Sequence, residues 1–219
     1  MTAPLPDAQI AIVGAGLSGL AAAARAQAAG LDWRLLEARA RVGGRAFSPA
    51  QGGRRYDLGP AWIWPGDARA RALAERLGLP VFEQASEGRL IFEDASGAIR
   101  RDLDMAPMAG SLRLAGGLGA LAEAAAAALP ADRLHLDAPV AGLRLASDPT
   151  GPVALLAPGE GAPRLRAAQV VLALPPRLAA GLAFAPALPE PAAAALRGAP
   201  GWMAAQAKLV AVYPAPFWR

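Results

Sequence analysis

The stretch from Ile10 to Arg45 constrains the fold more than any other part of the chain. It opens with Ile10 to Val13, four apolar residues typical of a strand buried on both faces of a parallel sheet. A glycine-rich turn follows, and Leu17 to Ala29 then has the alanine-rich composition of a helix. Trp33 to Leu36 is expected to form a second strand. This order of strand, helix and strand predicts a parallel βαβ unit.

Three glycines between the first strand and the helix have the spacing of a dinucleotide-binding turn. Gly14 permits the tight turn, Gly16 lets a pyrophosphate approach the backbone, and Gly19 lets the helix pack close to the strand. Glu37 ends the second strand 18 residues after Gly19, where an acid can accept hydrogen bonds from a ribose. The spacing alone is weak evidence, but its context predicts a dinucleotide site. It does not distinguish NAD from FAD.

The residues that follow favour FAD. Leu36-Glu37-Ala38-Arg39, continued by Arg41-Val42-Gly43-Gly44-Arg45, resembles the LEA-x-x-RVGGR signature of the flavin-containing amine oxidase family, which includes monoamine, polyamine and L-amino-acid oxidases. In such a segment Gly43 and Gly44 allow a second close backbone approach to the cofactor. Arg45 would place a fixed cation near its phosphates or near a substrate anion.

A third segment resembles the part of this family that runs beneath the flavin ring. Asp57-Leu58-Gly59-Pro60-Ala61-Trp62 is similar to the family's D-x-G-G-x-W/Y pattern, with Pro60 in place of the second glycine. Because proline has no N–H, any hydrogen bond that the family makes to the flavin from that amide is lost here. The alternation of Trp62, Ile63 and Trp64 fits two interpretations, in which the tryptophans either line the flavin pocket or form the core of a half-buried strand.

The C-terminal stretch carries the candidate catalytic residue. The segment that starts at Lys208, continues to Tyr213 and ends in Pro216-Phe217-Trp218-Arg219 resembles the family's K-x-x-x-x-Y-x-x-x-F-W segment, in which the lysine holds a water against flavin N5. Lys208 is the single lysine among 22 lysines and arginines. Arginine would serve equally as a surface charge, so the retained lysine favours a role for its compact ammonium. The alternative is an exposed lysine at the start of a strand.

The resemblance implies a set of cofactor-binding residues drawn from four segments of the chain. The residue that matches Val140 makes backbone hydrogen bonds to the adenine in this family, and Gln169 to Pro176 resembles the strand whose end passes near the cofactor. The expected FAD-binding residues are Gly14, Ala15, Gly16, Leu17, Ser18, Gly19, Glu37, Ala38, Arg39, Gly43, Gly44, Arg45, Gly59, Pro60, Ala61, Trp62 and Val140. His135, the single histidine, has no visible partner in the sequence and is not expected to be catalytic.

The expected architecture is α/β, with a Rossmann-like FAD-binding domain and an incomplete mixed α+β substrate domain. Residues 8–78 and 117–176 are assigned to the FAD-binding domain, and residues 79–116 and 177–219 to the partial substrate domain. A helix is expected over Asp67 to Leu77, capped by Asp67 and stopped by Gly78. Further short strands and two alanine-rich helices are expected downstream, over the ranges 81–83, 89–93, 98–100, 118–129, 134–136, 143–146, 153–156, 165–174 and 192–197.

The amino-acid composition excludes several kinds of site and partner. The chain has 219 residues and no cysteine, which excludes disulfides, thiolate metal sites, cysteine nucleophiles and a flavin attached through cysteine. No metal site is expected. The net charge is only +4, with the arginines scattered singly or in pairs, so no nucleic-acid partner is expected. No apolar run suits a membrane span or a signal peptide, and a cytoplasmic protein is the expectation.

The resemblance implies oxidation of an amine by FAD, with hydride transfer to flavin N5, hydrolysis of the imine, and reoxidation by molecular oxygen with release of hydrogen peroxide. It covers only the first half of the family, so we expect a truncated or partial chain that is completed by a separate C-terminal half or by a homo-oligomer. Two alternatives stay open. One is another FAD-dependent enzyme of the same cofactor fold, such as a carotenoid desaturase or protoporphyrinogen oxidase, and the other is an inactive nucleotide-binding remnant.

Overall fold

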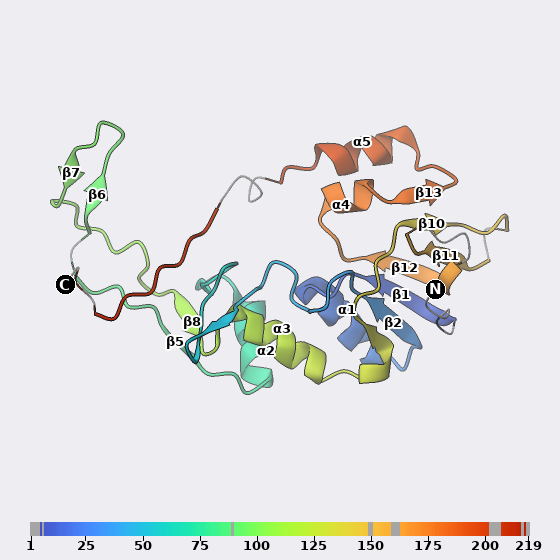
Figure 1. Ribbon diagram of the computed structural model, residues 1–219, viewed down its shortest axis with the longest axis horizontal. Coiled ribbons are helices and arrows are strands. Elements are labelled where there is room, and N and C mark those ends of the chain that lie inside the picture. The colour runs from blue at the N-terminus through green and yellow to red at the C-terminus, as the bar shows by residue number, and fades with distance from the viewer. Residues whose placement is uncertain are drawn as a thin grey trace. The chain divides into compact units, whose positions relative to one another are not determined.

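The computed structural model describes residues 5, 7–88, 90–148, 151–158, 163–201, 207–215 and 217 (Figure 1). The chain divides into two compact units. The first consists of Met1–Phe47 with Ala122–Arg219, and the second of Ser48–Leu121.

A seven-stranded sheet forms the centre of the first unit, in the order β13-β10-β11-β12-β1-β2-β9. β1 pairs in parallel with β2 and β12, and β2 pairs in parallel with β9, which confirms the Rossmann-like arrangement. β11 runs antiparallel to β10 and β12, and β13 runs parallel to β10. The strands are β1 (Ala8–Val13), β2 (Trp33–Leu36), β9 (Leu134–His135), β10 (Gly142–Arg144), β11 (Val153–Leu156), β12 (Pro163–Leu172) and β13 (Ala183–Ala185).

Each face of this sheet packs against its own apolar core, because successive side chains of a strand point to opposite faces. On one face, Ile12 and Trp33 are fully buried with residues of helix α1 (Leu17–Ala28) and the last part of helix α3 (Gly117–Ala127). On the other face, Val13 and Leu36 pack with buried residues of β10, β11 and β12. Short helices complete the unit, namely η1 (Ala131–Arg133), α4 (Pro176–Ala180) and α5 (Glu190–Gly198).

In its described residues the second unit contains three separate two-stranded sheets, one helix of its own and the start of α3. These are β3 (Ala50–Gln51) with β4 (Arg54–Arg55), β5 (Val81–Glu83) with β8 (Leu112–Leu114), β6 (Phe92–Glu93) with β7 (Ile99–Arg100), and α2 (Ala68–Arg76). An isolated antiparallel bridge also joins Ile63 to Leu112 of β8, which is itself paired with Glu83 of β5. Ile63 is 1% exposed, so it is the residue of the segment 62–64 that lies in the core.

A buried polar network holds the start of α3 in the second unit. The Asp57 carboxylate accepts hydrogen bonds at Oδ1 from the Leu118 N–H at 2.8 Å and from the Ser48 hydroxyl at 2.6 Å. The Ser48 Oγ in turn accepts the Gly119 N–H at 2.8 Å. Gly117 has a φ of +77°, and a Cβ there would lie 2.5 Å from Asp57 Oδ1. Two residues far back in the sequence therefore cap this helix.

Several sequence-based expectations need correction. The Asp67 side chain does not cap α2, because its Oδ2 accepts the Trp64 N–H at 3.0 Å instead; the stop at Gly78, which has a φ of +67°, is confirmed. No strand forms in residues 207–213, the stretch that contains Lys208. The sequence pattern also did not reveal β13, although its pairing with β10 places residues 183–185, predicted to lie in the substrate domain, in the large sheet.

Candidate dinucleotide-binding site

The turn between β1 and α1 has the geometry that each of its three glycines predicts. Gly14 has a φ of +101°, and a Cβ on it would lie 2.7 Å from the Ala173 carbonyl oxygen. A Cβ on Gly19 would collide with the carbonyl oxygen of Gly14. By contrast, a Cβ on Gly16 would meet no protein atom within 4 Å. Two glycines therefore serve the packing of strand against helix, and the third leaves space beside the backbone.

This open space lies at the positive end of α1. Gly16 is the N-cap residue of the helix and makes no side-chain cap hydrogen bond. The first-turn N–H groups of a helix have no partner within the helix, and together with the helix dipole they favour an anion. Ser18 is exposed in this first turn, whereas Ala15 is buried. The turn therefore has the donors and the room that a phosphate group requires.

The Glu37 carboxylate lies against the same turn. The side chain is 7% exposed, and its Oε2 accepts the Ala15 N–H at 2.8 Å while Oε1 accepts the Arg39 N–H at 3.0 Å. The backbone is held on both sides, because the Glu37 N–H donates to the His135 carbonyl oxygen at 2.8 Å and the Glu37 carbonyl accepts the Ala138 N–H at 2.8 Å. A carboxylate can accept about four hydrogen bonds. Capacity for two ribose hydroxyl groups therefore remains.

The second glycine pair packs directly on the first motif. The Gly43 N–H donates to the Ala15 carbonyl at 2.8 Å, and Gly16 and Gly43 form a parallel bridge. Gly43 and Gly44 both have positive φ, +95° and +57°. A Cβ on Gly44 would lie 3.6 Å from the Gly16 Cα. The structure therefore brings the two predicted glycine motifs together in one surface.

Arg41 stabilises this second glycine segment, a role that the sequence pattern did not assign. Its guanidinium donates to the carbonyl oxygens of Val42 at 3.2 Å and Gly44 at 3.0 Å, and lies 4.1 Å from the centre of the Phe47 ring. The other two arginines of the segment, Arg39 and Arg45, are exposed. Their placement leaves these two cations available to a ligand, whereas Arg41 shapes the loop.

The segment that precedes Val140 contacts the backbone beside Glu37. The Asp137 N–H donates to the Arg39 carbonyl at 3.1 Å, and Asp137 is a non-glycine residue with positive φ, at +49°. Val140 is partly buried against the core formed by β10, β11 and β12. The backbone of residues 37–39 is thus bonded to Asp137 and Ala138, two residues before Val140, and the contact of Val140 with an adenine remains a prediction.

The remaining predicted cofactor residues, Gly59 to Trp62, lie in the second unit. Ala61 is buried at 5% exposure and Pro60 is exposed. Side chains 62 to 64 alternate between buried and exposed, but Ile63 is the buried one, whereas Trp62 and Trp64 are 37% and 43% exposed. The two tryptophans therefore do not form the core of a strand. The tryptophan rings are 6.3 Å apart between their centres and inclined at 46°.

Lys208 is exposed in a stretch without regular secondary structure. The neighbouring Tyr213 and Phe217 rings contact each other edge to face at 5.0 Å, and Phe217 is 72% exposed. Pro216, Trp218 and Arg219 of the same predicted segment lie outside the described residues. The catalytic role of Lys208 remains a prediction.

His135 is half-buried at the edge of the sheet, and its Nε2 has no hydrogen-bond partner within the described part of the chain. Burial lowers the pKa of this imidazole, and the positive charges of Arg34 and Arg164 lower it further, against a smaller opposing effect of Asp132. The pKa shift therefore favours a neutral histidine, and its backbone carbonyl, not its ring, supports the site through Glu37.

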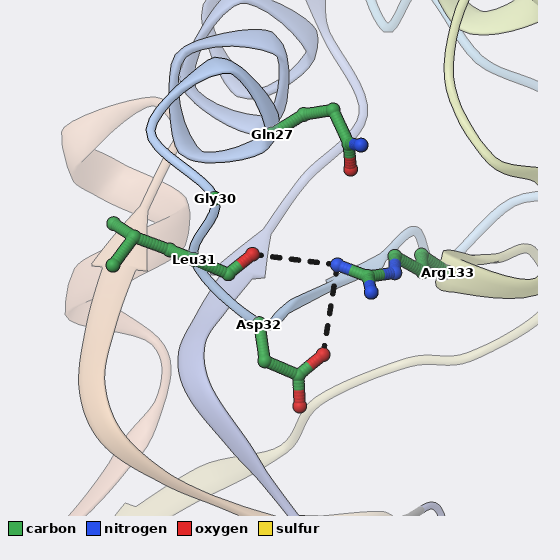
Figure 2. Close-up of a pocket in the computed structure, with 5 residues that line it drawn as sticks. All are labelled: Gln27, Gly30, Leu31, Asp32 and Arg133. Atoms are coloured by element: carbon green, nitrogen blue, oxygen red, sulfur yellow. Dashed lines mark hydrogen bonds and ion pairs between the residues drawn. The ribbon is translucent and has the colours of Figure 1, made fainter.

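A polar pocket of about 180 Å³ lies at the opposite end of β2 from Glu37 (Figure 2). Arg133 crosses it and donates to the Leu31 carbonyl at 3.3 Å, with the Asp32 carboxylate 3.6 Å away. Gln27 lines the pocket but accepts the Trp33 indole N–H at 3.0 Å. Dinucleotides bind beyond the carboxyl ends of parallel strands. This pocket is at the amino end, so we assign it to the packing of η1 against α1 and β2.

Within the ranges that the structure describes, no three His, Cys, Asp or Glu side chains are grouped so that they could hold a metal ion. The helices in those ranges are all too short or too polar to cross a membrane.

The glycine turn, Glu37 and the second glycine pair together define the site, and they define a Rossmann-like dinucleotide-binding protein.

Comparison with known families gives the same result in two parts. Residues 12–77 match the NAD(P)-binding Rossmann-like domain, and residues 90–219 match the flavin containing amine oxidoreductase family. The second match covers more than half of the chain. The chain therefore belongs to the flavin containing amine oxidoreductase family. FAD is the cofactor that this membership implies.

Individual relatives support this assignment. The chain is 38% identical over 86 residues to putrescine oxidase of Kocuria rosea, a match that covers 39% of this chain and 18% of that protein. It is 40% identical over 83 residues to human flavin-containing amine oxidase B, covering 37% of this chain and 16% of that protein.

Solved structures share the fold. Wild-type putrescine oxidase bound to putrescine matches with a TM-score of 0.73 and 22% identity over 86% of this chain and 62% of that chain. Cyclohexylamine oxidase from Brevibacterium oxydans matches with a TM-score of 0.75 and 19% identity over 87% of this chain and 63% of that chain. The chain covers less than two thirds of the length of these relatives.

Proposed function

We propose that this chain binds FAD and contributes to the oxidation of a small amine, with molecular oxygen as the electron acceptor. The observation that carries this proposal is the glycine turn, where Gly16 is open to a ligand, Glu37 is held against the Ala15 amide, and Gly43 is bonded to the same residue. These groups fit the pyrophosphate and ribose of a dinucleotide. Bound FAD would supply the acceptor for a hydride from the carbon that bears a neutral amine.

The residues of the chain would divide this task. The first-turn amides of α1, beginning at Leu17, bind the phosphates, and the Glu37 carboxylate orients the ribose. Arg39 and Arg45, whose side chains are exposed, neutralise phosphate charge. Lys208 orients a water at the flavin through its compact ammonium. Gly59 to Trp62 are the residues of the second unit that we propose contact the flavin.

The test has two stages. The purified 219-residue chain is incubated with FAD, gel-filtered and examined by its visible absorbance spectrum. A flavin spectrum near one FAD per chain supports the cofactor role, and a colourless protein contradicts the proposal that this chain holds FAD. Bleaching of that spectrum by putrescine or another small amine without oxygen, and peroxide release with oxygen, then support amine oxidation.

Lys208 is tested in the same assay. We expect Lys208→Met to keep the flavin spectrum but to slow flavin reduction or reoxidation by at least about tenfold, since a positioned proton or water relay contributes about 10²–10⁴-fold to a rate. Lys208→Arg keeps the charge and serves as the control for electrostatics. Rates equal to those of the parent chain for both half-reactions would remove Lys208 from the mechanism.

A second candidate function follows from the fold itself. A fatty acid isomerase structure from P. acnes matches with a TM-score of 0.61 and 18% identity, so this fold also occurs in a protein named for another reaction. Another FAD-dependent oxidase or desaturase activity is thus the alternative. Dye-coupled oxidation of unsaturated or saturated lipids without amine-dependent peroxide release would favour it.

A further inference from the structure

A chain of hydrogen bonds in the second unit runs from the first turn of α3 to an exposed indole ring. Its buried end is Asp57, which is 5% exposed and accepts the Leu118 N–H and the Ser48 hydroxyl. Arg113 continues the chain, because its Nη2 donates to Asp57 Oδ2 at 3.2 Å and its Nη1 donates to Gln84 Oε1 at 3.2 Å. Gln84 is therefore linked to the helix cap through one arginine.

Gln84 also fixes the orientation of Trp62. Its Oε1 accepts the Trp62 indole N–H at 3.0 Å, in addition to the Arg113 bond. The side-chain amide is held against a flip, because its Nε2 donates to the Ala85 carbonyl at 2.9 Å. The backbone is fixed separately, since the Gln84 N–H donates to the Ser111 carbonyl at 2.9 Å. The side-chain oxygen therefore faces the two donors. Rotation of the Trp62 ring would break the indole bond.

These contacts determine how Trp62 can meet a ligand. The indole N–H is already engaged, so the ring offers its apolar face rather than a donor. Trp62 is 37% exposed as a residue, and the centre of the Trp64 ring lies 6.3 Å from the centre of its ring. A side chain that is held in its binding conformation loses less entropy when a ligand arrives. A flat, neutral ring system is the ligand class that suits a fixed aromatic face.

We propose that Asp57, Arg113 and Gln84 are positioning residues that hold the Trp62 ring as a fixed platform for a planar ring. The identification of that planar ligand with the flavin ring rests on the proposed function above. The fixed orientation of Trp62 does not, because it depends only on contacts within the second unit. The two parts can therefore fail separately.

The orientation is tested in the full chain without added cofactor by ¹H–¹⁵N NMR of the tryptophan indole N–H groups, with Trp62 assigned by Trp62→Phe. In Gln84→Leu we expect the Trp62 signal to shift and its N–H exchange with water to accelerate roughly fivefold or more, as a hydrogen bond to a polar partner is lost. The Trp33 signal is the internal reference, since that ring is fully buried in the first unit.

Three further variants complete this test. Gln84→Glu keeps an oxygen acceptor and should restore slow exchange, whereas Arg113→Met should give a smaller acceleration than Gln84→Leu. Gln51→Leu removes an exposed glutamine elsewhere in the same unit and should change nothing. An unchanged Trp62 signal in both Gln84→Leu and Arg113→Met would overturn the positioning role.

Titration with FAD addresses the ligand. If the Trp62 ring receives the flavin, Gln84→Leu and Trp62→Phe should each weaken FAD binding about three- to tenfold, and Gln84→Glu should restore it. If the indole signals respond as expected but FAD affinity is the same in all variants, the positioning role stands and the flavin is excluded as the ligand of this ring. Binding of FAD by the parent chain remains the separate test of the proposed function.

Discussion

At the scale of single residues, the glycine turn separates a structural glycine from a binding glycine. Gly19 has no room for a side chain, because a Cβ would collide with the Gly14 carbonyl oxygen between β1 and α1. Gly16 has φ −70° and ψ 174°, a conformation that alanine adopts readily, and no protein atom lies near its missing Cβ. The same conservative substitution should therefore have two different consequences.

We expect Gly16→Ala to lower the free energy of unfolding by less than about 1 kcal/mol, since only the helix N-cap changes. Its added methyl group occupies the space for the phosphates, so FAD affinity should fall at least about tenfold. Gly19→Ala should instead lower the free energy of unfolding by at least about 2 kcal/mol through overpacking. Denaturant unfolding and FAD titration of both variants measure this contrast, and equal stability losses would contradict the division of roles.

Residue patterns also show which parts of the site could be read in advance. The three glycines, Glu37 and the pair Gly43 and Gly44 were predictable because each meets a local backbone or spacing requirement. Arg41 was not, since its contacts with Gly44 and Phe47 exist only after the loop folds back on itself. The inward face of the segment 62–64 was likewise undetermined, because Ile63 and its two tryptophan neighbours are all apolar.

At the scale of elements, α3 shows how a helix start can depend on distant residues. Its sequence before Leu118 is Gly116-Gly117, with no Ser, Thr, Asp or Asn at the cap position. Ser48 and Asp57 supply the acceptors from 71 and 61 residues away. Local propensity could predict the helix from its alanines, but not this cap. The same limit applies to Asp67, whose carboxylate bonds the Trp64 N–H instead of the helix that follows it.

Removal of the Asp57 carboxylate should therefore destabilise the second unit strongly. Asp57→Ala leaves the Leu118 N–H and the Arg113 guanidinium without their acceptor, and we expect a loss of about 2–4 kcal/mol in the free energy of unfolding. Asp102→Ala breaks an exposed bidentate pair with Arg100 and is the matched control, with little measurable change expected. Chemical unfolding of the three proteins, followed by circular dichroism, compares them. A loss in Asp57→Ala as small as in the control would show that water replaces the cap.

At the scale of the whole molecule, the single histidine makes the pH dependence of stability traceable to one group. The folded protein lowers the pKa of His135 below the value of about 6.5 for an unfolded chain. Above that pH the ring is neutral in both states, and its contribution to stability is fully present. As the pH falls through about 6.5, the unfolded state binds a proton first, so the free energy of unfolding decreases.

We expect the urea midpoint of the parent chain to fall between pH 7.5 and pH 5.5, and His135→Gln to show a smaller fall over the same range. The unfolding curves at three pH values measure this, and titration of the one imidazole C–H signal by NMR reports the folded-state pKa directly. A folded-state pKa above 6.5 would mean that Asp132 outweighs burial and the two arginines. The contribution of His135 to the pH dependence of the urea midpoint would then reverse in sign.

The arrangement of the sheet was predictable for its longer apolar strands, and less so at its β13 edge. The apolar composition of β2 and β11 predicts that they are strands, and both have the bounds that the sequence indicates. β13 is only three residues long, Ala183–Ala185, and exists because β10 offers it an edge. Non-local pairing of this kind leaves no periodic trace in a short segment.

The bridge between Gly16 and Gly43 has a practical consequence for protein engineering. Each glycine segment forms part of the wall on which the other rests, through the bond from the Gly43 amide to Ala15. Grafting one of these loops from another nucleotide-binding protein to change the cofactor specificity would thus replace only one of two segments that pack against each other. Transplants that carry residues 14 to 47 as a single cassette keep both segments, together with Glu37 and Arg41, and are the ones that should fold.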